Sequence, residues 1–210
     1  MIKNYFGWVY LHIAALCIIA AASAELNLLS GTPWLILAVL SFASLFGILS
    51  LAPGSALQYL FFVAFGFLIG QLEHVFVEMD KQKGILTYIL ITIACIFAAM
   101  TALGFIDNQN LLGFGPYLFA GLTGLIVAQF ALLIYQYYGG HSDGQNSFVD
   151  TTWKWLAGFG TVLFTAFIAY DTQRLKRNAA YSNTPNYPRD SLSLFLDIAN
   201  LFNDLSILKS

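Results

Sequence analysis

No charged residue occurs between Leu26 and Leu72, and this long apolar stretch limits the chain to folds that a membrane can hold. Over the whole chain, hydrophobic residues make up 59% and charged residues only 10%. Soluble domains carry roughly 25% charged residues, so this chain lacks the polar side chains that a water-facing surface needs. We therefore predict an integral multi-pass membrane protein, and 210 residues correspond to one domain.

Polar breaks divide the chain into seven apolar segments. Inside the uncharged stretch the firmest break is Leu51-Ala52-Pro53-Gly54-Ser55, which is typical of a turn between two helices. About 20 residues cross the roughly 30 Å of hydrocarbon as a helix. We predict one all-α membrane domain over residues 1–210, a seven-transmembrane-helix bundle, with spans near 5–24, 34–51, 56–77, 84–105, 111–135, 153–172 and 191–208.

The first segment has two interpretations. Lys3, the apolar residues after it and the ending Ala22-Ser23-Ala24 are also typical of a cleavable signal peptide. The length of the segment favours a retained span.

The distribution of lysine and arginine favours a cytoplasmic N-terminus, because cytoplasmic loops carry an excess of both residues. This orientation places five basic residues on the cytoplasmic side, namely Lys3, Arg174, Lys176, Arg177 and Arg189, and leaves Lys81, Lys83, Lys154 and Lys209 on the other. A bacterial inner membrane and an endoplasmic reticulum or Golgi membrane both fit this pattern.

Two carboxylates interrupt the apolar pattern near the end of the chain. Asp171 ends the sixth segment, Asp197 lies inside the seventh, and the basic segment Gln173–Asp190 separates them. A charge in hydrocarbon costs at least a few kcal/mol, so such residues normally face a protein interior or a water-filled cavity. Since the two helices should run antiparallel, we predict that the acids lie at similar depth and form a pair. The alternative is that Asp171 pairs with Arg174 and Asp197 is a separate buried acid.

The seventh segment also carries a polar stripe. Ser193, Asp197, Asn200 and Asp204 recur at spacings of four, three and four residues, which places them on one helix face. We therefore predict a central last helix ringed by the other six; the alternative is an amphipathic helix in the membrane interface. Glu73, near the end of the third span, is either a third interior carboxylate or a marker of the water interface.

The acidic pair suggests a chemistry. Two carboxylates in a low-dielectric site resist double ionisation and titrate as a coupled unit. Once ionised they repel each other or bind a cation, and oxygen ligands suit a hard ion such as calcium. We interpret Asp171 and Asp197 as proton-sensing, gating and candidate calcium-binding residues, and Asp204, Asn200 and Glu73 as pore or cation-binding candidates.

At these residues the chain resembles the transmembrane Bax inhibitor motif family. The resemblance is carried by Tyr170-Asp171-Thr172-Gln173 and by Ser193-Leu194-Phe195-Leu196-Asp197-Ile198-Ala199-Asn200-Leu201-Phe202, and Gly70-Gln71-Leu72-Glu73 is similar to the family's Gly/Glu segment. It implies a seven-helix bundle with a central last helix, and a calcium leak gated by a proton-sensing pair that maps onto Asp171 and Asp197. In eukaryotic members this activity goes with suppression of cell death.

The chain departs from the family pattern in one respect. Some members set a basic residue of the second span against the aspartate, and Leu26–Leu72 contains no lysine or arginine. A latch would therefore need another group, such as Arg174.

Other functions have less support in the sequence. We expect no enzyme and no catalytic residue, because the chain has no HExxH, GxSxG or glycine-rich phosphate loop. Lys209 lies too near the end for a retinal protein, and Leu194-Phe195-Leu196-Asp197 lacks the second motif of intramembrane aspartyl proteases. A non-conducting scaffold or regulator of other membrane proteins and a proton-coupled carrier stay as alternatives. We expect no cofactor, with calcium as the permeant ion, and protons and the lipid bilayer as partners. Nucleic acid is not expected at a net charge of −2.

Overall fold

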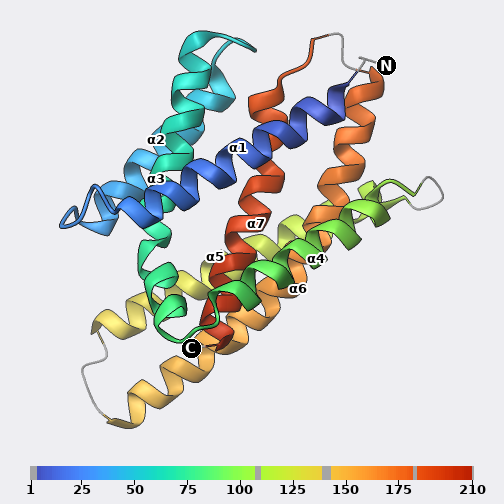
Figure 1. Cartoon of the computed structure of the whole chain (residues 1–210). Coiled ribbons are helices and arrows are strands. Elements are labelled where there is room, and N and C mark those ends of the chain that lie inside the picture. Colours follow the sequence, from blue (N-terminus) through green and yellow to red (C-terminus); the bar gives the residue numbers. More distant parts are fainter. Residues whose placement is uncertain (1–3, 107–109, 139–142, 182–183, 210) are drawn as a thin grey trace. The chain divides into compact units, whose positions relative to one another are not determined.

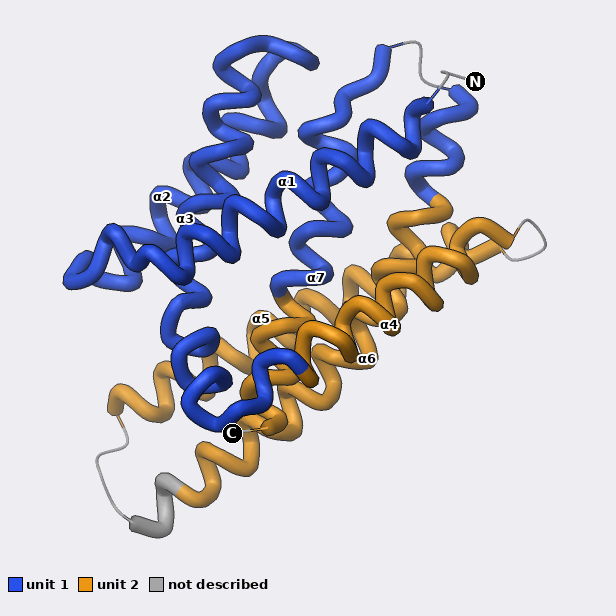
Figure 2. Tube along the Cα trace, in the orientation of Figure 1, with its two compact units in different colours: residues 1–87, 174–199 blue, residues 88–173, 200–210 orange. Residues whose placement is uncertain are grey.

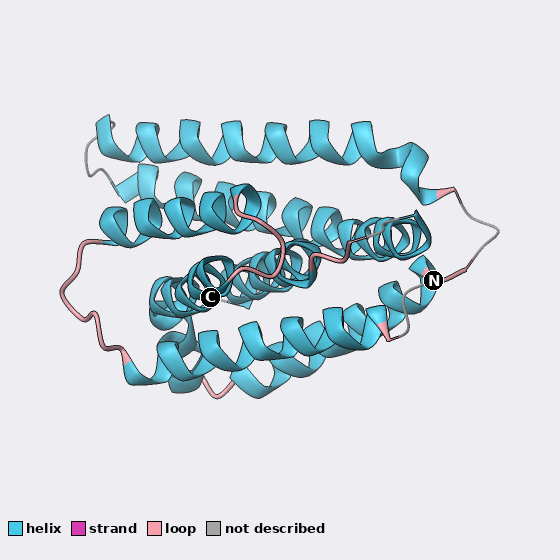
Figure 3. Cartoon of the chain, turned by 90° about the horizontal axis from the view of Figure 1, so that it is seen from above, coloured by secondary structure: helices cyan, strands magenta, loops and turns pink. Residues whose placement is uncertain are grey.

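The computed structural model describes residues 4–106, 110–138, 143–181 and 184–209, and every regular element in these ranges is a helix (Figures 1 and 3). The elements are α1 (Tyr5–Leu26), α2 (Trp34–Ser50), α3 (Ala56–Gln82), α4 (Leu86–Gly104), the short 3-10 helix η1 (Leu111–Phe114), α5 (Gly115–Tyr138), α6 (Asp143–Tyr181) and α7 (Tyr187–Lys209). The predicted all-α class with seven helices is confirmed.

Most of these helices have the length and composition of membrane spans. Within the described ranges, α1, α3, α4, the combined η1–α5 segment and α7 are long and apolar enough to cross a membrane. The apolar helix α2 is shorter, with 17 residues. In α6 the predicted span contains Lys154 and ends near Asp171, which makes it less apolar.

Two helices continue well past their predicted spans. The helix α6 extends to Tyr181 and α7 begins at Tyr187, so most of the basic segment 173–190 is helical. Arginine, lysine and alanine favour helix, and water beyond the hydrocarbon does not end one. At the start of α7 the side-chain oxygen Oδ1 of Asn186 accepts a hydrogen bond from the Arg189 backbone N–H at 3.2 Å, as an N-cap residue does.

The chain forms two compact units (Figure 2). Unit 1 comprises residues 1–87 and 174–199, and unit 2 comprises residues 88–173 and 200–210. Unit 1 therefore holds α1 to α3, the end of α6 and the first half of α7, whereas unit 2 holds α4, α5, most of α6 and the end of α7. The assignment of the whole chain to one membrane domain stays a prediction.

In unit 1, α1 and α3 run parallel and approach closely at two glycines of α3. A Cβ atom at Gly66 would lie 2.9 Å from Cδ2 of Leu16, and one at Gly70 would lie 2.8 Å from the carbonyl carbon of Ala20. The two glycines are four residues apart, the spacing that brings membrane helices together. Contact at this distance is possible only because both positions lack a side chain.

An apolar cluster joins four helices of unit 1. Its buried members are Leu16 of α1, Ile48 of α2, Phe62 and Phe65 of α3, and Leu192 and Phe195 of α7. The rings of Phe65 and Phe195 meet edge to face with their centroids 6.1 Å apart, a favourable aromatic geometry. The first half of α7 is thereby held against the core of the unit.

In unit 2, α6 contacts α4, α5 and α7. A Cβ atom at Gly104 of α4 would lie 2.6 Å from the Thr172 Cβ, and one at Gly115 of α5 would lie 2.9 Å from the Tyr170 hydroxyl. The aromatic rings of Phe119 and Phe167 add an edge-to-face contact between α5 and α6. Gly104 and Gly115 thus let α4 and α5 approach the residues of α6 around Asp171.

The last helix is the most enclosed of the long apolar helices. In the most apolar 18-residue stretch of α7, half of the residues are buried. In the corresponding stretches of α1, α3, α4 and η1–α5 the buried share is 33% or less. Enclosure of this extent is what the predicted central, polar-striped last helix requires.

Candidate functional site

Asp171 lies on α6 in unit 2 and is only 4% exposed. Its neighbours in the sequence are anchored to three different elements. The Tyr170 ring meets Phe119 of α5 edge to face, Thr172 packs on Gly104 of α4, and the Leu112 N–H of η1 donates to Oε1 of Gln173 at 3.0 Å. The contacts of Tyr170, Thr172 and Gln173 thus fix the position of the backbone at Asp171.

Asp197 lies on α7 in unit 1 and is 5% exposed. It follows Phe195, a member of the apolar cluster, by two residues. Four residues earlier, the buried Ser193 hydroxyl has no hydrogen-bond partner among the described residues. Because Asp171 belongs to unit 2 and Asp197 to unit 1, the pairing of the two acids stays a prediction.

The two remaining stripe residues, Asn200 and Asp204, belong to unit 2. Asn200 is half-buried, whereas Asp204 is 4% exposed. The Asp204 carboxyl packs directly against Gly160 of α6, and its Oδ2 atom has no hydrogen-bond partner in the described part of the chain.

Metal-ligating side chains do not gather in the ranges that the structure describes. No group of three or more His, Cys, Asp or Glu side chains there is arranged to hold a metal ion. The assignment of calcium to Asp171 and Asp197 therefore stays a prediction.

Glu73 is half-buried on α3, next to residues that bind the end of α1. The Gln71 side-chain amide donates to the Ser23 carbonyl at 2.5 Å and to the Ser23 hydroxyl at 2.8 Å. The Ser23 hydroxyl in turn donates to the Phe67 carbonyl at 2.6 Å, and the Leu29 N–H donates to Oε1 of Gln71 at 2.9 Å. The Leu29 N–H, just beyond α1, thus gains a partner, and the Ser23 carbonyl, which already accepts from the Asn27 N–H at 3.0 Å, receives a second hydrogen bond.

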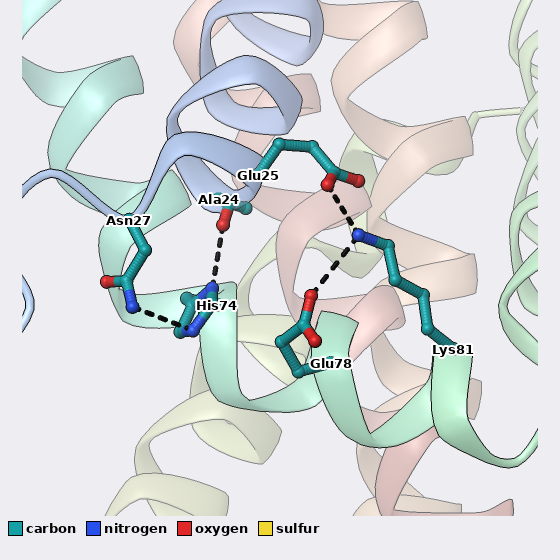
Figure 4. Close-up of polar contacts among 6 residues, drawn as sticks. All are labelled: Ala24, Glu25, Asn27, His74, Glu78 and Lys81. Carbon is teal, nitrogen blue, oxygen red and sulfur yellow. Dashed lines mark hydrogen bonds and ion pairs between the residues drawn. The ribbon is translucent and has the colours of Figure 1, made fainter.

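His74 continues this contact one turn further along α3 (Figure 4). Its Nδ1 lies 2.7 Å from the Ala24 carbonyl, and its Nε2 lies 2.9 Å from the side-chain nitrogen of Asn27. A carbonyl only accepts, so Nδ1 carries the hydrogen, and Nε2 accepts from the Asn27 amide. His74 thus contacts both the last turn of α1 and the residue that follows it.

A surface ion pair completes the junction between α1 and α3. The Lys81 ammonium lies 2.5 Å from a Glu25 carboxylate oxygen and 3.2 Å from one of Glu78 (Figure 4). All three side chains are partly exposed. The end of α1 is therefore fastened to α3 by a buried amide, an imidazole and an exposed ion pair.

Two fully buried polar residues were not predicted from the sequence. Asp80 is 0% exposed, although its charged neighbours Glu78 and Lys81 suggested a solvated turn. Gln58 is also 0% exposed. Its amide nitrogen donates to the Ile48 carbonyl at 2.8 Å and to Oδ1 of Asn186 at 3.0 Å, which links the α2–α3 turn to the start of α7. A glutamine within the uncharged stretch Leu26–Leu72 was the sequence signal that could have indicated such a contact.

Comparison with known proteins decides the family. The model of the family described as "Inhibitor of apoptosis-promoting Bax1" matches residues 1–210. The chain belongs to this Bax inhibitor family. Bax inhibitor 1 of Schizosaccharomyces pombe is 28% identical over 173 residues, which cover 81% of this chain and 59% of that protein. Protein lifeguard 4 of Mus musculus is 32% identical over 107 residues, covering 51% of this chain and 39% of that protein.

A bacterial relative is similar over a shorter region. An uncharacterized protein of Caulobacter vibrioides is 29% identical over 120 residues, 53% of this chain and 42% of that protein. The chain thus spans about half the length of the curated relatives it matches. Members of the Bax inhibitor family are non-enzymatic membrane proteins, so the chain is an integral multi-pass protein of the lipid bilayer.

Proposed function

We propose that this Bax inhibitor family protein is a pH-sensitive calcium leak channel in which Asp171 and Asp197 share protons and gate ion flow. The observation that carries the proposal is the burial of both carboxyls, at 4% and 5% exposure, on helices of a membrane protein. Ionisable residues inside membrane helices are costly, and they commonly mark ion pathways and proton relays.

The gating step needs only these two acids. While the pair holds a proton, the two side chains share a hydrogen bond that holds α6 and α7 together. When the second proton leaves, two like charges in a low-dielectric site repel each other or attract a cation. Tyr170, Thr172 and Gln173 are fastened to α5, α4 and η1. Movement on gating is therefore expected in α7.

Calcium is the proposed ion because the candidate ligands are all oxygen donors. Asn200 and Glu73 would provide amide and carboxylate oxygens along the path, and hard cations bind such groups. Only transient binding is required, since a conducting site must release its ion.

A second candidate function is a non-conducting regulator of another membrane protein. It is favoured by the family description, which names the protein Bax as the target and no ion. The names Bax inhibitor 1 and Protein lifeguard 4 of the relatives likewise describe protection. A calcium leak that limits stored calcium would link calcium homeostasis to suppression of cell death, so the two candidates share that outcome.

Calcium flux into liposomes tests the proposal. Purified protein is reconstituted into vesicles that contain a calcium dye, and the rate is measured between about pH 6 and pH 8, where a coupled pair can titrate. We expect wild-type flux that depends on pH and does not saturate with calcium, and a pH profile that flattens in Asp171→Asn and in Asp197→Asn. Asp150→Asn is the matched control, because this acid lies on the same helix as Asp171 and is exposed.

Each alternative gives a different result. Saturable flux driven by a proton gradient would indicate a carrier, and no flux above that of empty vesicles would leave the regulator. Identical pH profiles of wild type and both pair variants would remove the two acids from gating.

A further inference from the structure

The contact between Asp204 and Gly160 joins α7 to α6 inside unit 2. The carboxyl lies where the first side-chain atom of any other residue at position 160 would be, since a Cβ atom there would overlap Oδ2 and lie 2.9 Å from Cγ of Asp204. Two residues earlier on the same helix, a Cβ atom at Gly158 would meet only Cδ2 of Leu208, at 4.0 Å. The two helices thus run antiparallel. Of these two glycines, only Gly160 provides the space that the Asp204 carboxyl occupies.

No charged side chain in the described part of unit 2 is placed to neutralise an ionised Asp204. The helices α4 and α5 contain no Asp, Glu, Lys, Arg or His. On α6, Lys154 is exposed and lies six residues from Gly160, about 9 Å along the axis. Asp150 and Asp171 lie further away, at about 15 Å and 17 Å. On α7 the ammonium of Lys209 lies over the Tyr88 ring, 5.1 Å from its centroid.

We propose that the Asp204 carboxyl is a proton-binding site in its own right. It lies against the backbone of α6, which is possible because Gly160 has no side chain. The carboxyl is buried, and Oδ2 has no partner among the described residues. An ionised oxygen in such a place loses its hydration and gains nothing in return. A protonated oxygen becomes a donor, and a helical carbonyl that already accepts one hydrogen bond keeps a second lone pair.

This site is distinct from the proposed gate. Asp204 follows Asp197 by two helical turns in the sequence, and its contact uses Gly160 and not Asp171. The proposed site binds one proton at one carboxyl, so it does not depend on coupling between two acids. Its readout is a vibrational band and not ion flux, which separates its failure from failure of the calcium leak.

Infrared spectroscopy of the full chain in lipid vesicles tests the site. Aspartate labelled with carbon-13 identifies the C=O stretching band of protonated Asp side chains. At neutral pH we expect wild type to show a component of this band that is lost in Asp204→Asn. The same component should be kept in the exposed-acid control Asp150→Asn and in the pair variants Asp171→Asn and Asp197→Asn, which separates it from a proton held by the pair. Gly160→Ala pushes the carboxyl out of its place and should shift the band, whereas Gly158→Ala should leave it unchanged.

Two results would overturn the proposal. One is an unchanged protonated-Asp band in Asp204→Asn. The other, which applies even where Asp204→Asn does not fold, is a band in Gly160→Ala that matches the bands of wild type and Gly158→Ala.

Discussion

Gln71 and Lys81 both bind α1 to α3, but they should contribute very differently to stability. The Gln71 amide is buried and bonds Ser23 and the Leu29 N–H, whereas Lys81 forms partly exposed ion pairs. We expect Gln71→Leu to lower the free energy of unfolding by about 1–3 kcal/mol, because the Leu29 N–H loses its bond to Gln71 and buried Ser23 loses the bonds from the amide. Lys81→Ala should change it much less than Gln71→Leu does, because solvent screens exposed ion pairs.

Thermal unfolding in detergent micelles, followed by circular dichroism, measures both variants against wild type. Equal losses in the two variants would contradict the argument, because they would mean that the α1 end depends on its surface charges as much as on the buried amide.

At the residue scale, the sequence indicates which polar residues are important but not which groups they contact. Gly70-Gln71-Leu72-Glu73 was noticed through its resemblance to a family segment, yet the partners of Gln71 are Ser23 and a backbone N–H just beyond α1. Such partners depend on where α1 ends, which no side-chain pattern specifies. The same holds for Asp204, whose neighbour Gly160 has no side chain to reveal the contact.

Between elements, the crossing of α1 and α3 depends on Gly70. A Cβ atom there would overlap the Ala20 carbonyl oxygen and lie 2.8 Å from the Ser23 Cβ, and both groups belong to a helix that cannot yield locally. We expect Gly70→Ala to separate the two helices and destabilise the protein by about 1–3 kcal/mol. Gly7→Ala on α1 is the control, because nothing lies within 4 Å of a Cβ atom there. It should be neutral or stabilising by up to about 1 kcal/mol.

Guanidinium unfolding of the micelle-bound protein, read from tryptophan fluorescence, compares the two alanine variants. A Gly70→Ala protein as stable as Gly7→Ala would show that the close approach at Gly70 does not hold the helices.

The glycine spacing and the polar stripe were element-scale signals that the sequence contains. The four-residue spacing of Gly66 and Gly70 permits a close helix approach, and the helix that approaches is α1. The stripe from Ser193 to Asp204 predicted an enclosed last helix, and α7 is the most enclosed of the long apolar helices. The partners of each helix could not be predicted, because one small-residue face fits any other helix.

For the whole molecule, seven apolar segments separated by polar breaks were enough to predict seven helices. The two compact units were not predicted, because their boundaries fall inside α4, α6 and α7, where the sequence has no linker. Helix ends beyond the hydrocarbon were also missed, as in the basic extension of α6 to Tyr181. Hydropathy indicates which residues lie in lipid and not where a helix ends. A helix continues into water wherever its residues have high helix propensity and its backbone hydrogen bonds can form.

The orientation of the whole chain gives the last prediction. The basic end of α6 should face the cytoplasm, and the connection between α1 and α2 should lie on the opposite side. Ser30 and Ala180 are exposed positions in these two regions, and each can carry a single cysteine once Cys17 and Cys95 are replaced by alanine. In intact bacterial cells that express the chain, a membrane-impermeant maleimide should label Ser30→Cys, and should label Ala180→Cys only after permeabilisation. The reverse pattern would invert the protein in the membrane, and labelling of both from outside would mean that one of the helices α2 to α6 does not cross the bilayer.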